Sequence, residues 1–358
     1  MKSHEAILEE LEASEEERQN ALEEARRLRN TTRALRELRS ENAILKRANG
    51  VLEEHLSVRS ALAEAIKIPP VARLNRKQER DGIIPVGFQS DEHYDEEFTL
   101  SQTGGLNEQN PTLAEEKAHT YAKRLIGLIE REAFRNPVPY MVAPLMGDMM
   151  TGELHAKDER CSRMTPTEAA RFAYKLKRSI FDALLATDIP RIIVPCVDGN
   201  HGRTTARRTP GLNQRYSHEH DVYLRLAEHY LEAAPKRIEF YVPESDFVTC
   251  SIAPGFTLCI THGDTVKGGS GTGRLAPPLG TAVARWRQAH PANLYALGHH
   301  HQLFDLGSVV VNPCAVGYNP YAASLGLDPG DFPTGAQLFT TLHLGRMKRA
   351  TTCPIWVR

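Results

Sequence analysis

The chain has 358 residues, of which 41% are hydrophobic and 25% are charged, so it can bury a sizeable core and is not a disordered protein. Lys and Arg number 44 against 45 Asp and Glu, for a net charge of −1, so bulk charge gives no indication of a nucleic-acid partner. No apolar run approaches the roughly 20 residues of a membrane-spanning helix, and the acidic N-terminus lacks the apolar core of a secretion signal, so a cytoplasmic protein is expected.

Residues 1–67 are predicted to form one long helix, because the segment contains no proline and is rich in Leu, Ala, Glu and Arg. From Leu28 onward, Leu and Asn recur at heptad spacing, and Asn at the a position favours a parallel two-stranded coiled coil. We therefore expect a homodimer joined through this helix; the alternative is a helix that packs on its own globular domain. Residues 26–47 carry eight Lys or Arg against two Glu, as a zipper-type DNA-binding helix does, although mixed-charge solvated faces are far commoner.

The long helix is expected to end at Pro69–Pro70, since proline cannot continue helical hydrogen bonding, and residues 68–82 are predicted to be a linker. In the second predicted domain, residues 83–358, short apolar runs alternate with amphipathic helices and then give way to more strands. This pattern predicts a layered α/β domain. Strands are predicted at Ile83–Gln89, Val138–Met146, Arg191–Val197, Ile238–Val242, Phe247–Ala253, Phe256–Thr261, Leu294–Leu297, Ser308–Val311 and Gln337–His343, and helices at Pro111–Phe134, Pro166–Leu185 and His218–Ala233.

Five short polar clusters each follow a predicted strand. They fall at the carboxyl ends of the strands, where open α/β sheets bind their ligands. Glycine precedes a polar residue in three of them and allows a sharp turn with close backbone approach. The clusters are Ser90-Asp91-Glu92-His93, Gly147-Asp148, Asp198-Gly199-Asn200-His201-Gly202-Arg203, Thr261-His262-Gly263-Asp264 and Gly298-His299-His300-His301.

Carboxylate and imidazole together are ligands that suit Mn, Fe, Zn and similar divalent ions. Such side chains from separate loops can hold two ions ~3.5–4 Å apart, with one carboxylate between them, and this arrangement activates a hydroxide and clamps phosphoryl oxygens. Each cluster alone is a weak signal, but their joint order along the chain is a strong one. None of the six cysteines forms a CxxC pair, which excludes a zinc ribbon.

In the order D-x-H, G-D, G-N-H, H and G-H-x-H, these clusters resemble the calcineurin-like metallophosphoesterases. More narrowly, residues 83–345 resemble a phage-encoded branch described as DNA repair exonucleases. The narrower resemblance rests on the motifs Gly104–Asn110, Gly147–His155 and Gly199–Arg203, and on Asn312-Pro313 with the residues that follow. It implies a four-layer sandwich of two packed β-sheets flanked by helices, DNA as the substrate, and a phage protein that works in the cytoplasm of a bacterial host.

The resemblance also implies two metal sites that share Asp148 as the bridging ligand. The metal is expected to be Mn, with Fe, Zn or Mg as alternatives, and a hydroxide between the two ions is expected to attack phosphorus. The other ligands would be Asp91, His93 and His301 for one ion, and Asn200, His262 and His299 for the other.

Two further residues receive roles from the resemblance. His201 would be the acid that protonates the leaving oxygen, and Arg203 would clamp the phosphate, because a guanidinium pairs with phosphate oxygens in bidentate geometry. The expected function is a metal-dependent phosphodiesterase that acts as a DNA exonuclease. The alternatives are a phosphomonoesterase acting on nucleotides or phosphoproteins, and a coiled-coil scaffold without catalysis.

Overall fold

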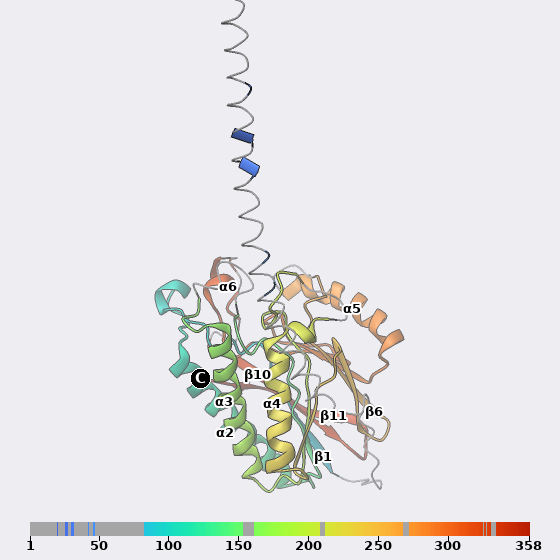
Figure 1. The fold of residues 1–358 in the computed structure, drawn as a ribbon. Coiled ribbons are helices and arrows are strands. Elements are labelled where there is room, and N and C mark those ends of the chain that lie inside the picture. The colour runs from blue at the N-terminus through green and yellow to red at the C-terminus, as the bar shows by residue number, and fades with distance from the viewer. Residues whose placement is uncertain are drawn as a thin grey trace, which may run out of the picture. The chain divides into compact units, whose positions relative to one another are not determined.

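The computed structural model describes residues 82–152, 161–207, 212–267, 272–324, 326, 328–330 and 334–358, together with seven isolated positions before residue 50 that are helical (Figure 1). The chain divides into two units, Met1–Lys67 and Ile68–Arg358, and the fold below is that of the second. The predicted coiled coil, the basic stretch 26–47 and the linker lie outside the described residues, apart from those isolated positions and residue 82.

The first sheet has six strands in the order β11-β10-β1-β2-β3-β4. Strands β1 to β4 run parallel to one another, since the helices α2 (Pro111–Ala133), α3 (Pro166–Leu185) and α4 (His218–Ala233) connect them in turn. Strands β10 and β11 pair antiparallel to their neighbours. The bounds are β1 Ile83–Gly87, β2 Met141–Val142, β3 Ile192–Pro195, β4 Ile238–Tyr241, β10 Ala336–His343 and β11 Lys348–Trp356.

The second sheet has five strands in the order β5-β6-β7-β9-β8. Strands β6, β7 and β9 run parallel, and α5 (Thr272–Ala289) connects the first two of them. Strand β5 pairs antiparallel with β6, and β8 with β9. The bounds are β5 Phe247–Ala253, β6 Phe256–Thr261, β7 Leu294–Leu297, β8 Phe304–Asp305 and β9 Val309–Val311.

The two sheets pack face to face around one apolar core. Side chains such as Val86 and Ile193 of the first sheet lie in the same buried cluster as Leu258 and Ala296 of the second. Figure 1 shows α2, α3 and α4 on one side of the sheets and α5 on the other. On that second side, Leu279 and Trp286 of α5 are buried against residues of β6, β7 and β9. The predicted architecture, two packed sheets with helices outside them, is thus confirmed for the described residues.

The helices that connect the parallel strands begin at strong capping signals. The side chain of Asn110 accepts from the amide of Leu113 before α2, and Thr165 and Glu168 form a capping box before α3. Proline follows both caps, at the position where its missing N–H costs nothing. Ser217 caps α4 in the same way as Asn110 caps α2.

Several elements differ from the prediction. The strand predicted at Val138–Met146 is regular only over Met141–Val142, because Pro139 and Pro144 on either side have no N–H to donate. Helix α5 was not predicted; it contains Pro277 and Pro278, which ordinarily break a helix. Strand β11 was also not predicted, since it lies at the sheet edge with many exposed side chains.

Candidate metal centre

Parallel strands deliver the predicted ligands to one edge of the molecule. Beyond the regular strands, Leu145 forms parallel bridges with both Gln89 and Cys196, so the chain segments after β1, β2 and β3 stay aligned. Their loops carry Asp91 and His93, Asp148, and Asn200, while His262 follows β6 and His299 and His301 follow β7.

Six of the predicted ligands, together with the predicted acid His201, form three overlapping groups, in each of which the potential ligand atoms lie within 4.8 Å of one another. Each group contains two buried side chains and one partly exposed side chain, so the cluster is anchored in the core and reaches solvent on one side. Asp148 and His93 each belong to two groups. The groups are Asp91, His93 and His301; His93, Asp148 and His201; and Asp148, His262 and His299.

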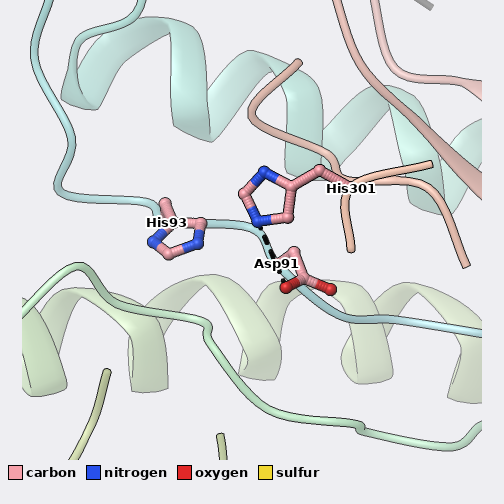
Figure 2. Close-up of side chains that lie close together, drawn as sticks. All are labelled: Asp91, His93 and His301. Carbon is pink, nitrogen blue, oxygen red and sulfur yellow. Dashed lines mark ion pairs between the residues drawn. The ribbon is translucent and has the colours of Figure 1, made fainter. Parts of the chain in front are cut away.

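In the first group, His301 faces Asp91 from the opposite loop, with its Nε2 3.3 Å from Oδ1 of Asp91, and His93 lies beside them (Figure 2). The ring centroids of His93 and His301 are 5.4 Å apart. Three donor side chains from two distant segments therefore surround one small space.

In the third group, His262 lies at the centre. Its Nε2 is 2.9 Å from Oδ2 of Asp148 and 3.1 Å from Oδ1 of Asn200, and its ring centroid is 5.1 Å from that of His299. Asn200, which carries an amide rather than an ionisable group, therefore lies with the predicted ligands of the second metal.

The backbone of these loops is strained at the ligands themselves. Six described non-glycine residues have positive φ, and five of them are predicted ligands. Such angles are uncommon outside glycine and persist where the surrounding structure enforces them, often at functional sites. The five are Asp91 (54°), His93 (42°), Asp148 (56°), His299 (66°) and His301 (53°).

Glycines allow the loops to approach more closely than any side chain would permit. A Cβ on Gly199 would lie 2.0 Å from Oδ1 of Asp148, and one on Gly298 would lie 2.3 Å from Oδ2 of Asp91. Gly147 also has positive φ (86°), and its Cβ would meet the amide nitrogen of Gly199 at 2.2 Å. The glycines of the sequence clusters are thus required by loop-to-loop contact.

Backbone groups orient the two histidines nearest to Asp148. Nδ1 of His262 lies 2.7 Å from the carbonyl oxygen of Met146, and Nδ1 of His201 lies 2.7 Å from that of Thr151. Because a carbonyl only accepts, Nδ1 is the donor in both rings. Nε2 of each ring is then the atom available to the site.

The two buried aspartates remain anionic. Burial alone would raise the pKa of Asp148, but His262, His201 and His93 hold it well below its ordinary value. Burial likewise opposes ionisation of Asp91, yet His301 lowers its pKa to about 2. Burial would lower the pKa of His262, but Asp148 raises it to about 10. Two carboxylates that stay ionised in the interior create a negative electrostatic potential, which favours the binding of a cation.

His93 supplies a direct test of whether this cluster fits metal ions. Both of its ring nitrogens are buried and have no hydrogen-bond partner among the described residues, and burial, with His201 beside it, lowers its pKa to about 3. A neutral imidazole with two unsatisfied buried nitrogens is costly unless one of them binds a cation. The donor set of carboxylates, imidazoles and one amide oxygen suits divalent metals, so the residues fit the expected ions.

The side chain of Arg203 contacts its own loop. Its Nε donates to the carbonyl oxygen of Thr205 at 3.0 Å, and a terminal nitrogen contacts that of Ala206 at 3.4 Å. The guanidinium thus braces its own loop in this structure.

Sequence reasoning missed several buried groups that support the ligands. Asp95 accepts from the amide of Thr151 at 2.7 Å, and Glu219 accepts from Met149 and Gly199. Asn312 links the two sheets behind Asp91 through Ser90 and Gln337. Asn312 belongs to a motif of the narrower resemblance, but the sequence gives it no role. Glu219 was missed because an acidic residue in the first turn of a helix ordinarily only complements the helix dipole.

No protein-family model matches the chain, and no curated protein matches it. Among solved structures, a dimetal phosphatase from Danio rerio is similar, with 12% sequence identity and a TM-score of 0.36 over 78% of this chain and 100% of that chain. A TM-score of this size supports no argument about function, and the proposals below rest on the site itself.

Proposed function

We propose that the chain is a metal-dependent phosphoesterase with two divalent ions and, more finely, a phosphodiesterase that acts on DNA. The observation that carries the coarser proposal is the buried Asp148, which belongs to two groups of potential metal ligands. The DNA substrate, exonuclease action, manganese as the metal and a phage origin rest on the sequence resemblance alone.

We assign the ligands to the two ions as the sequence resemblance implies. Asp91, His93 and His301 would hold one ion, and Asn200, His262 and His299 the other, with Asp148 shared by both. When bound, divalent ions at such a site supply Lewis acidity toward water and phosphoryl oxygens. The anionic state of the two aspartates favours their binding.

Two contacts of His201 support a role in proton transfer. Its Nδ1–H donates to the carbonyl oxygen of Thr151, and its backbone amide donates to Oδ1 of Asp148 at 2.8 Å. These contacts hold the ring beside the cluster, where it remains partly exposed. We propose that a proton on Nε2 passes to the leaving oxygen of the substrate. Arg203 would reach a phosphate only if its side chain left the carbonyls that it now contacts.

The test is manganese-dependent hydrolysis of bis-p-nitrophenyl phosphate compared with p-nitrophenyl phosphate, followed by digestion of end-labelled single- and double-stranded DNA. We expect diester and DNA cleavage that EDTA abolishes. Hydrolysis of the monoester alone would identify a phosphatase, and hydrolysis of neither would favour the scaffold. D148N should lose both metals and all hydrolysis, whereas D188N, a change at an exposed aspartate, should behave as the wild type.

A further inference from the structure

The loop that carries Asn200 and His201 lies along the start of α4, and the two segments run in opposite directions. Five residues at the start of the helix contact residues progressively earlier in the loop, on both sides of Asn200 and His201. In order, Ser217 bridges Arg203, the amide of His218 donates to Gly202 at 2.8 Å, Glu219 accepts from Gly199 at 2.7 Å, His220 lies 3.2 Å from Asp198, and the Tyr223 hydroxyl donates to Val197 at 3.2 Å.

Glu219 differs from its neighbours because its carboxylate contacts two loops. Oε1 accepts from the amide of Met149 at 2.6 Å and Oε2 from the amide of Gly199 at 2.7 Å. These amides stand directly after Asp148 and directly before Asn200. The side chain is fully buried, so both bonds are made away from water, where an unsatisfied partner is costly.

The space around Glu219 is shaped for this side chain. A Cβ on Gly202 would lie 2.4 Å from Cγ and 2.9 Å from Cδ of Glu219, so the glycine after His201 leaves the room that the glutamate fills. The charge is expensive here, because burial and the nearby Asp148 raise the pKa of Glu219 to about 8. Two backbone donors aimed at its two oxygens offset part of that cost.

We propose that Glu219 is a positioning residue that fixes the Asp148 loop and the Asn200–His201 loop in register, so that their side chains bind metal together. This inference rests on the proposed function. Glu219 touches neither substrate nor metal in this account; it acts through the backbone on either side of the ligands.

The test is E219Q, assayed in the full-length chain for Mn²⁺ affinity by titration calorimetry and for amide exchange by mass spectrometry. The amide group of glutamine can accept one N–H but presents a donor to the other. We expect Mn²⁺ to bind about 10–100-fold more weakly, as for other residues that support metal ligands, and amides in peptides covering Met149 and Gly199 to exchange faster.

The matched control is Y230F. Tyr230 lies on the same helix and donates to Asp182, away from both loops, so its loss should lower the unfolding temperature without changing Mn²⁺ affinity. G202A is a second variant that displaces Glu219 by steric contact while every polar group is kept, and it should weaken Mn²⁺ binding as E219Q does. If E219Q does not fold, the Mn²⁺ affinity of G202A tests the role of Glu219.

The outcomes separate the two proposals. Unchanged Mn²⁺ affinity in a folded E219Q or G202A, or an equal loss in Y230F, would overturn the role of Glu219 while the proposed function stands. A wild-type protein that binds no divalent metal would overturn the proposed function itself. In that case, slow exchange at Met149 and Gly199 that E219Q abolishes would show a clamp without a metal site.

Discussion

Asp148 and His262 form a buried pair in which each side chain stabilises the charge on the other. Asp148 raises the pKa of His262 to about 10 although burial opposes it. A histidine with a raised pKa stabilises the fold fully below its unfolded value of ~6.5, and that contribution is lost as pH rises toward 10. The metal-free protein therefore gains stability from a proton that a metal must displace.

Metal binding should accordingly release at least one proton near neutral pH. Since a metal binds only the neutral imidazole, Mn²⁺ affinity should rise with pH, by up to about tenfold per unit for each proton displaced. Calorimetric titrations at pH 7 in two buffers of different ionisation enthalpy measure the number of protons. H262Q should release one fewer, and a heat of binding independent of the buffer would contradict the pairing.

His201 should be dispensable for metal binding and important for turnover. H201A should keep the metal content of the wild type and lose ~10²–10⁴-fold in turnover on DNA, the usual contribution of a general acid. The loss should be smaller on bis-p-nitrophenyl phosphate, because nitrophenolate leaves without a proton.

The control for this change is H119A, which alters an exposed histidine on α2 and should leave both quantities unchanged. Loss of metal in H201A would make His201 a ligand. An equal loss on both substrates would argue against proton donation.

At the scale of elements, a buried amide network joins the two sheets where their strand ends meet. The side chain of Asn312, after β9, donates to Ser90 and Gln337 at 2.8 and 2.7 Å and accepts from the amide of Leu338 at 2.7 Å. Gln337 in turn accepts from the amide of Ser90. The network therefore fixes the residue directly before Asp91 to both sheets.

N312A should destabilise the protein strongly, because it leaves the buried amide of Leu338 without its acceptor and removes the donor to the Ser90 hydroxyl. We expect a loss of about 2–3 kcal/mol in the free energy of unfolding, measured by urea denaturation of the metal-free protein. N293A is the control: Asn293 also accepts a backbone amide, that of Thr257, but is exposed, so its loss should be smaller. Equal losses would mean that the network adds nothing beyond a surface hydrogen bond.

At the scale of the whole molecule, residues 1–67 remain the subject of a prediction from sequence. We propose that they form a parallel coiled coil that pairs two copies of the chain. Deletion of residues 1–66 should convert a dimer to a monomer in multi-angle light scattering while hydrolysis of small diesters is kept. An unchanged number of chains per particle after the deletion would contradict the proposed coiled coil.

Part of the site could be predicted because it depends only on the local order of residues along the chain. A polar cluster after an apolar strand can be recognised from a few residues, and parallel strands bring such clusters to one edge whatever else the chain does. Close together after the strands lie Asp91, His93, Asp148, Asn200, His262, His299 and His301, and their role as metal ligands stays a prediction. Helices α2, α3 and α4 could be predicted because an amphipathic pattern is also a local property of the sequence.

Other features depended on which distant residues fold against one another. Glu219 and Asn312 resemble ordinary polar residues until the packing of α4 and the meeting of the two sheets supply their partners. Helix α5 could not be predicted because it contains two prolines, and its apolar face is buried only where it packs against the second sheet.

The sequence by itself determined which polar side chains follow the strands, because residue type and position after an apolar run are local properties. Only the tertiary structure decided which groups hold those side chains in place, since a buried donor is satisfied by whatever the fold brings within hydrogen-bond distance.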